Sequence, residues 1–76
     1  MENKIQVELE KLSHDVKTPL TSILGFTQLL LEDESITGKT REYLEVIEAE
    51  AKNLTKLVLD GIEQIEREIG NEAAER

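Results

Sequence analysis

The most constraining feature of the sequence is a long and regular spacing of apolar side chains in its first half. These side chains recur at alternating steps of four and three residues, at Ile5, Leu9, Leu12, Val16, Pro19, Ile23, Phe26 and Leu30. A mean step of about 3.5 residues places all of them on one side of an α-helix, as in a coiled coil. The spacing therefore predicts a helix over about residues 3–33 that packs against other helices.

A second pattern of the same kind fills the other half of the chain. Its apolar positions are Leu44, Ile47, Ala51, Leu54, Val58, Ile62, Ile65 and Ile69. Two consecutive steps of four meet at Val58, which interrupts the heptad repeat and locally unwinds a coiled coil. We predict a helix over about residues 40–69. Because Gly70 and Asn71 favour a helix end, residues 70–76 are expected to form a linker or a frayed tail.

The segment between the two patterns is rich in residues that form turns and helix caps. It runs from Asp33 to Lys39, and either Ser35 or Thr37 can cap the second helix. We predict a turn over about residues 34–39. Such a short connection makes the two helices antiparallel neighbours.

The size of the chain limits how well a single hairpin can bury its apolar side chains. At 76 residues it is one small domain, and chains of this length bury only about 60% of their unfolded surface. Only two residues are aromatic, Phe26 and Tyr43, so aliphatic side chains must build the core. We therefore expect an all-α fold in which residues 1–69 form an antiparallel two-helix hairpin that homodimerises into a four-helix bundle.

Charge and composition argue against several classes of function. A net charge of −8 disfavours nucleic acid and anionic membranes as partners. The sequence contains no cysteine, no apolar run of about 18 residues and no signal-peptide pattern at its N-terminus, which is typical of a cytoplasmic protein. Glu10 and His14 could supply only two ligands, so no metal site is expected. The segment Thr37–Thr40 superficially resembles the end of a phosphate-binding loop but lacks the earlier glycine.

The first helical pattern contains the chain's only histidine, His14, and its only proline, Pro19. The heptad places His14 away from the apolar seam, where two different partners could reach its ring. Histidine suits nucleophilic chemistry, because its usual pKa of about 6.5 leaves a neutral imidazole available at pH 7. Pro19 is expected to kink the helix beside His14. Alternatively, Pro19 could begin a new helix with Thr18 as its cap, although the continuous heptad favours a kink.

The run His14-Asp15-Val16-Lys17-Thr18-Pro19-Leu20 resembles the H-box of sensor histidine kinases. The resemblance is detailed from about Lys11 to Leu31 and looser to about Ile65. It implies a dimerisation and histidine-phosphotransfer domain of a two-component system. In this family the histidine, here His14, receives a phosphoryl group from ATP and Mg²⁺ bound on a separate catalytic domain. It then passes the group to an aspartate in the receiver domain of a response regulator.

The same resemblance implies roles for the neighbours of His14. Asp15 would orient and activate the imidazole, and Thr18 would position water for dephosphorylation of the regulator. Lys17 would contact phosphate or the acids of the receiver, with a simple solvated lysine as the alternative. Thr21, Ser22 and Gly25 are the candidate partner-binding residues on the exposed side. Gly25 would permit either the close approach of another backbone or tight packing within the bundle.

No pattern for a nucleotide-binding domain follows the second helix, so the chain itself is expected to hold no cofactor. We interpret it as part of a longer cytoplasmic kinase, and anchoring of that kinase in a bacterial inner membrane stays open. Two alternatives remain. One is a stand-alone dimeric histidine phosphotransferase, and the other is a structural dimerisation hairpin in which His14 has no chemical role.

Overall fold

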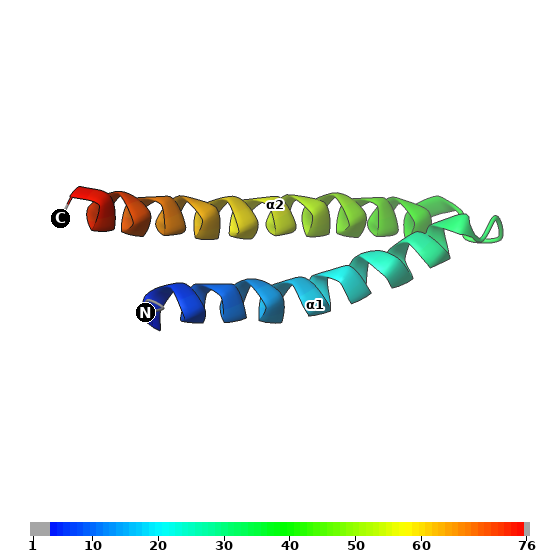
Figure 1. Ribbon diagram of the computed structural model, residues 1–76. Helices are drawn as coiled ribbons and strands as arrows, with labels where there is room; N and C mark the ends of the chain where they lie inside the picture. The colour runs from blue at the N-terminus through cyan, green and yellow to red at the C-terminus, as the bar shows by residue number, and fades with distance from the viewer. Residues whose placement is uncertain (1–3, 76) are drawn as a thin grey trace.

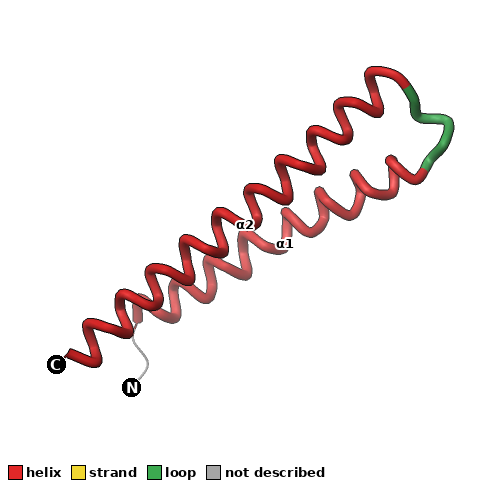
Figure 2. Tube along the Cα trace, turned by 90° about the horizontal axis from the view of Figure 1, so that it is seen from above, coloured by secondary structure: helices red, strands yellow, loops and turns green. Residues whose placement is uncertain are grey.

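The computed structural model describes residues 4–75, with side chains described as far as Gly70. Two α-helices, α1 (Lys4–Glu32) and α2 (Gly38–Glu75), run antiparallel and are joined by residues 33–37 (Figure 1). The hairpin measures 60 × 17 × 12 Å, and the outer ends of both helices lie at the same end (Figure 2). The predicted all-α hairpin is confirmed.

The second helix is longer than the sequence predicted. It continues through Gly70 and Asn71 to Glu75, so the expected helix stop at this pair is wrong. A glycine ends a helix most effectively with a positive φ angle, and among the described residues only Gly38 has one, at 62°. In α2, Gly70 costs about 1 kcal/mol of helix propensity, which the good helix formers of residues 72–75 offset.

The turn between the helices is organised by Asp33. Its carboxylate Oδ1 accepts hydrogen bonds from the Ser35 amide at 2.9 Å and from the Ser35 hydroxyl at 2.6 Å. The Ile36 amide donates to the Asp33 carbonyl at 3.1 Å and closes the turn. The Ser35 hydroxyl is therefore bound within the turn and not to α2.

Arg41, in the first turns of α2, ties the connection together. Its guanidinium donates to the carbonyl oxygens of Leu31 at 2.8 Å, Ile36 at 2.9 Å and Asp33 at 3.3 Å. The last carbonyl groups of a helix lack hydrogen-bond donors within the helix. Arg41, which belongs to α2, supplies such a donor to the end of α1. The sequence pattern gave no sign of this contact.

The two helices meet along a narrow seam. On α1 the buried residues are Leu20 and Thr27, and on α2 they are Ala51 and Ile62. The seam is extended by half-buried residues, which include Leu9, Ser13, Val16, Leu24 and Leu31 of α1. The predicted seam of α1 is therefore divided: Leu9 and Val16 turn towards α2, whereas Leu12, Ile23 and Phe26 stay exposed.

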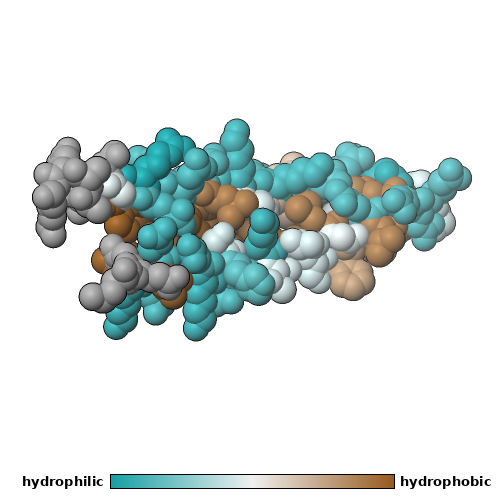
Figure 3. Space-filling model, in the orientation of Figure 1, coloured by the Kyte–Doolittle hydropathy of each residue, from teal (hydrophilic) through white to brown (hydrophobic). Residues whose placement is uncertain are grey.

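Six of the exposed apolar side chains lie on one side of the hairpin. Leu12, Ile23 and Leu30 of α1, and Ile47, Leu54 and Ile65 of α2, each directly precede a half-buried residue. Successive helical residues are about 100° apart, and in an antiparallel pair this rotation brings all six to the same side. We call these six residues the apolar face. Figure 3 shows a single side of the hairpin, on which polar side chains surround a line of apolar ones between the two helices.

The opposite side of the hairpin holds residues that directly follow inward-facing ones. They include His14, Lys17 and Thr21 of α1, which follow Ser13, Val16 and Leu20 respectively. We call this side the histidine face. α1 runs through Pro19 without interruption, so this proline does not begin a new helix, and the helix changes direction near its middle (Figure 1).

The pKa of Asp33 provides a test of the turn. The two hydrogen bonds from Ser35, and to a lesser extent the charge of Arg41, hold the pKa of Asp33 below its ordinary value of 3.8. A folded-state pKa below the unfolded one gives stability that is present above the unfolded pKa and is lost as pH falls through the folded pKa. An NMR titration of the Asp33 carboxyl should give a midpoint below 3.8, and Ser35→Ala should raise it. An unchanged midpoint in the variant would contradict the described turn.

Arg41 should contribute measurably to stability. Arg41→Ala leaves the carbonyls of Leu31 and Ile36 without their described partner, and we expect it to lower the free energy of unfolding by about 2 kcal/mol. The matched control is Arg67→Ala, which removes an exposed pair with Glu63 and should change stability little. Urea unfolding at equal protein concentrations compares the two variants. Equal midpoints for both would show that Arg41 does not hold the turn.

Candidate functional site

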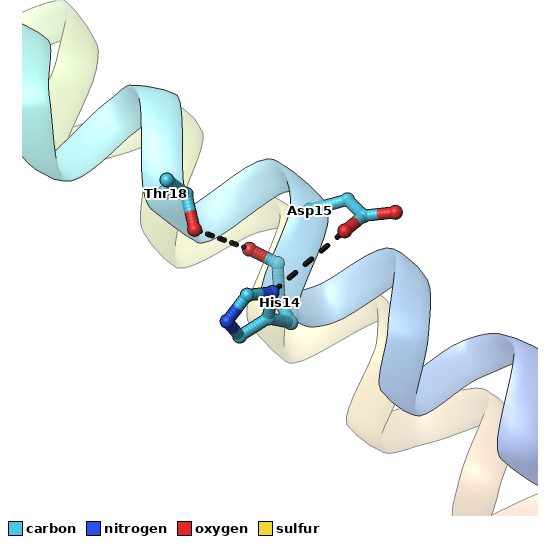
Figure 4. A network of polar contacts seen from close by, with 3 residues as sticks. All are labelled: His14, Asp15 and Thr18. Carbon is cyan, nitrogen blue, oxygen red and sulfur yellow. Dashed lines mark hydrogen bonds and ion pairs between the residues drawn. The ribbon is translucent and has the colours of Figure 1, made fainter.

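His14 lies on an exposed part of α1, and its side chain is 82% accessible. The adjacent Ser13 faces α2 and is half-buried, so the helix turns the imidazole into solvent. Its Nδ1 lies 3.7 Å from Asp15 Oδ1, slightly beyond hydrogen-bond distance (Figure 4). The other ring nitrogen, Nε2, points away from the carboxylate. The two nitrogens of the ring are thus placed differently, with one beside a negative charge and the other open to a partner.

Thr18 lies one turn after His14 and is bound to the same part of the backbone. Its hydroxyl donates to the His14 carbonyl oxygen at 3.0 Å (Figure 4). A hydroxyl that donates its only proton keeps its lone pairs and can still accept a hydrogen bond from water. The next residue, Pro19, has no N–H to offer the carbonyl of Asp15 four residues earlier. The backbone around His14 is therefore held partly by a side chain.

The other predicted residues are also exposed. Thr21 and Gly25 continue the row formed by His14 and Thr18, and Ser22 lies one turn beyond Thr18. A Cβ added at Gly25 would meet no atom within 4 Å, so packing against α2 of the same chain does not require a glycine there. The structure thus places His14, Thr18, Thr21 and Gly25 on one accessible surface, with Lys17 beside it.

Sequence patterns missed the contribution of α2 to this surface. Lys52 and Lys56 directly follow the inward-facing Ala51 and Thr55, so they lie on the histidine face. The sequence could have predicted that these lysines lie on the histidine face only if the stripe of α2 that packs against α1 had been known. Within the described residues, no three His, Cys, Asp or Glu side chains are grouped closely enough to hold a metal ion.

The fold and the site together define a helical hairpin that presents an exposed histidine side chain to solvent. The chain belongs to the His Kinase A (phospho-acceptor) domain family, whose sequence pattern matches residues 6–68. It is therefore a phosphoacceptor domain of the sensor histidine kinase type. The predicted family is confirmed.

Similar proteins are much longer than this chain. It is 37% identical over 62 residues to the signal transduction histidine-protein kinase BarA of Escherichia coli K12, covering 82% of this chain and 7% of BarA. The sensor protein GacS of Pseudomonas syringae is 44% identical over 50 residues, which are 66% of this chain and 5% of GacS.

A third relative is the circadian input-output histidine kinase CikA of Thermosynechococcus vestitus, with 34% identity over 70 residues. That match covers 90% of this chain and 10% of CikA. The chain thus spans a tenth or less of these relatives. No solved structure gives a significant match. Neither described helix combines the length and the apolar character that crossing a membrane requires.

Proposed function

We propose that His14 accepts the γ-phosphoryl group of ATP bound with Mg²⁺ on a separate catalytic domain and passes it to a receiver aspartate of a response regulator. The observation that carries this proposal is the 82% exposed imidazole, with Asp15 beside one nitrogen only. Three relatives whose names identify them as histidine kinases or sensor proteins support it. An exposed ring on a rigid helix suits a group that two different proteins must reach in turn.

We propose a separate role for each ring nitrogen, supported by the position of Asp15 beside only one of them. In the neutral tautomer with its proton on Nδ1, the lone pair of Nε2 attacks the γ-phosphorus. An N–P bond forms while the bond from phosphorus to the bridging oxygen breaks, and ADP leaves. The ring gains positive charge in this step. Asp15 Oδ1, at 3.7 Å from Nδ1, lowers the energy of that charge and favours the reactive tautomer.

The apolar face supports a second part of the proposal, that the chain forms a homodimer. Its six side chains are between 44% and 50% exposed. Over residues 4–70, the hairpin buries only three apolar residues of its own, Leu20, Ala51 and Ile62. Exposed apolar side chains that share one side of a helical hairpin are characteristic of an interface. A second copy of the chain brings an identical face and completes a four-helix bundle. The histidine face points away from this interface and stays accessible in the dimer.

Thr18 is suited to positioning water in a separate reaction, the hydrolysis of the aspartyl phosphate on the regulator. Its hydroxyl donates to the His14 carbonyl, which fixes the direction of the remaining lone pairs. A water molecule that donates to Thr18 keeps its own lone pair for attack on an aspartyl phosphate. Because a hydroxyl neither gains nor loses a proton at neutral pH, Thr18 orients this water and does not act as a base.

The first experiment tests the phosphoacceptor. His14→Gln should leave the helical circular dichroism spectrum unchanged, because the side chain is exposed, and should abolish labelling by γ-labelled ATP when the catalytic domain is present. In the unchanged chain the label should be acid-labile, as expected of an N–P bond. Label that persists in the variant would place the phosphoacceptor elsewhere. A correctly folded chain that is never labelled would favour the structural hairpin.

A second experiment separates the roles of Thr18 and Asp15. Thr18→Ala should leave phosphorylation of His14 nearly unchanged and slow dephosphorylation of the regulator by about 10²-fold, the scale of lost positioning. Thr18→Ser keeps the hydroxyl and serves as the control. Asp15→Ala should mainly slow phosphorylation of His14. Both rates are measured on all three variants of the assembled kinase, and the assignment fails if Thr18→Ala loses phosphorylation but keeps phosphatase activity.

A further inference from the structure

Two segments without acidic residues stand out in this acidic chain. Asp and Glu number 17 among 76 residues, yet residues 16–31 and residues 51–59 contain neither. The first segment contains Lys17 and the second contains Lys52 and Lys56. The negative charge is therefore excluded from two particular stretches, and lysine is the only charged residue type in both.

The hairpin places these three lysines beside His14. His14 lies 18 residues before Glu32, which ends α1, and Lys56 lies 18 residues after Gly38, which begins α2. In an antiparallel hairpin, residues equally distant from the turn lie at the same level, so Lys56 is level with His14. Lys52 lies four residues, or about 6 Å, closer to the turn, at the level of Thr18.

The lysines also lie on the correct side of the hairpin. Lys17, Lys52 and Lys56 each directly follow an inward-facing residue, so all three are on the histidine face, and all three are exposed. The Lys52 ammonium lies 3.9 Å from Glu48 Oε1, at the outer limit of an ion pair. Among the described ion pairs none involves Lys17 or Lys56. Their charges are thus available to a partner, and we call these three lysines the basic patch.

Acidic side chains bound the patch along the axis of the hairpin. On the histidine face, Glu10 and Glu63 precede it towards the outer end, and Glu45 follows it towards the turn. A local positive region within a negative surface attracts an acidic partner to one place and repels it from the neighbouring places. This arrangement provides orientation as well as attraction.

We propose that the basic patch is a docking site for the carboxylate-rich surface of the protein that exchanges phosphoryl groups with His14. This inference rests on the proposed function. An aspartate that accepts a phosphoryl group with the help of Mg²⁺ needs further carboxylates to hold the cation, so the surface that approaches His14 is acidic. The patch lies within one turn of the imidazole along the helix axis, where such a surface must arrive.

The test measures transfer from phosphorylated His14 to the receiver in the full-length kinase. Lys52→Gln combined with Lys56→Gln should lower the second-order rate constant of transfer about tenfold and weaken its dependence on salt. Lys52→Arg combined with Lys56→Arg keeps both charges and should restore the rate. Lys39→Gln, near the turn, is the control for a change of net charge and should leave the rate unaltered.

The outcomes distinguish this proposal from the proposed function. Label that never reaches His14 in the unchanged kinase contradicts the proposed function itself. Label on His14 followed by transfer that is equally fast and equally salt-dependent in the glutamine variant overturns only the docking site. An equal loss of rate in Lys39→Gln overturns it too, because net charge would then explain the effect. Slower phosphorylation by ATP with unchanged transfer would assign the patch to the nucleotide-binding domain and also overturns the proposal.

Discussion

The packing of α1 on α2 is too limited to account for the apolar content of the chain, and the rest of the structure depends on this fact. Among the residues whose side chains are described, the only buried apolar ones are Leu20, Ala51 and Ile62. Each buried aliphatic side chain contributes about 1.5–3 kcal/mol, against a conformational cost of about 1–2 kcal/mol for every ordered residue. Two long helices cannot be held by three such residues. The proposed dimer would supply a second apolar interface by covering the apolar face.

This requirement divides the hairpin into two functional sides. The apolar face holds side chains that gain from being covered, whereas the histidine face holds polar, small and basic residues that tolerate exposure. Because both helices present each face in the same direction, covering one side with a second copy leaves the other side open. The position of His14 one residue after an inward-facing serine is sufficient to place it on the open side. In the proposed dimer, the interface and the accessible side of His14 are therefore opposite surfaces of the hairpin.

Sequence reasoning succeeded where a single periodicity determines the structure. The apolar repeats predicted both helices and the antiparallel hairpin, and the heptad predicted that His14 points away from the apolar seam. It did not separate two stripes that differ by one residue, so Leu9 and Val16 were grouped with Leu12 and Ile23 although the helix turns them to different neighbours. A spacing of three and four residues does not resolve a rotation of 100° when both stripes are apolar.

Other features depend on contacts that local patterns do not contain. The bonds of Arg41 to carbonyls up to ten residues away arise from the three-dimensional turn. The extension of α2 through Gly70 reflects the helix formers that follow it, which outweigh a weak local stop. The position of Lys56 at the level of His14 can be predicted only when the length of the connection between the helices is known. Each of these features follows from ordinary physical chemistry once the arrangement of the two helices is known.

The central claim, that a second copy covers one side and leaves the histidine side open, is tested most directly by thiol accessibility. The natural sequence contains no cysteine, so Ile23→Cys on the apolar face and Thr21→Cys on the histidine face each introduce a single reporter. At high protein concentration the thiol at position 23 should react at least about tenfold more slowly than the thiol at position 21, and dilution should remove the difference, since protection requires the dimer. Equal reaction rates at every concentration, with both variants folded, would contradict the account.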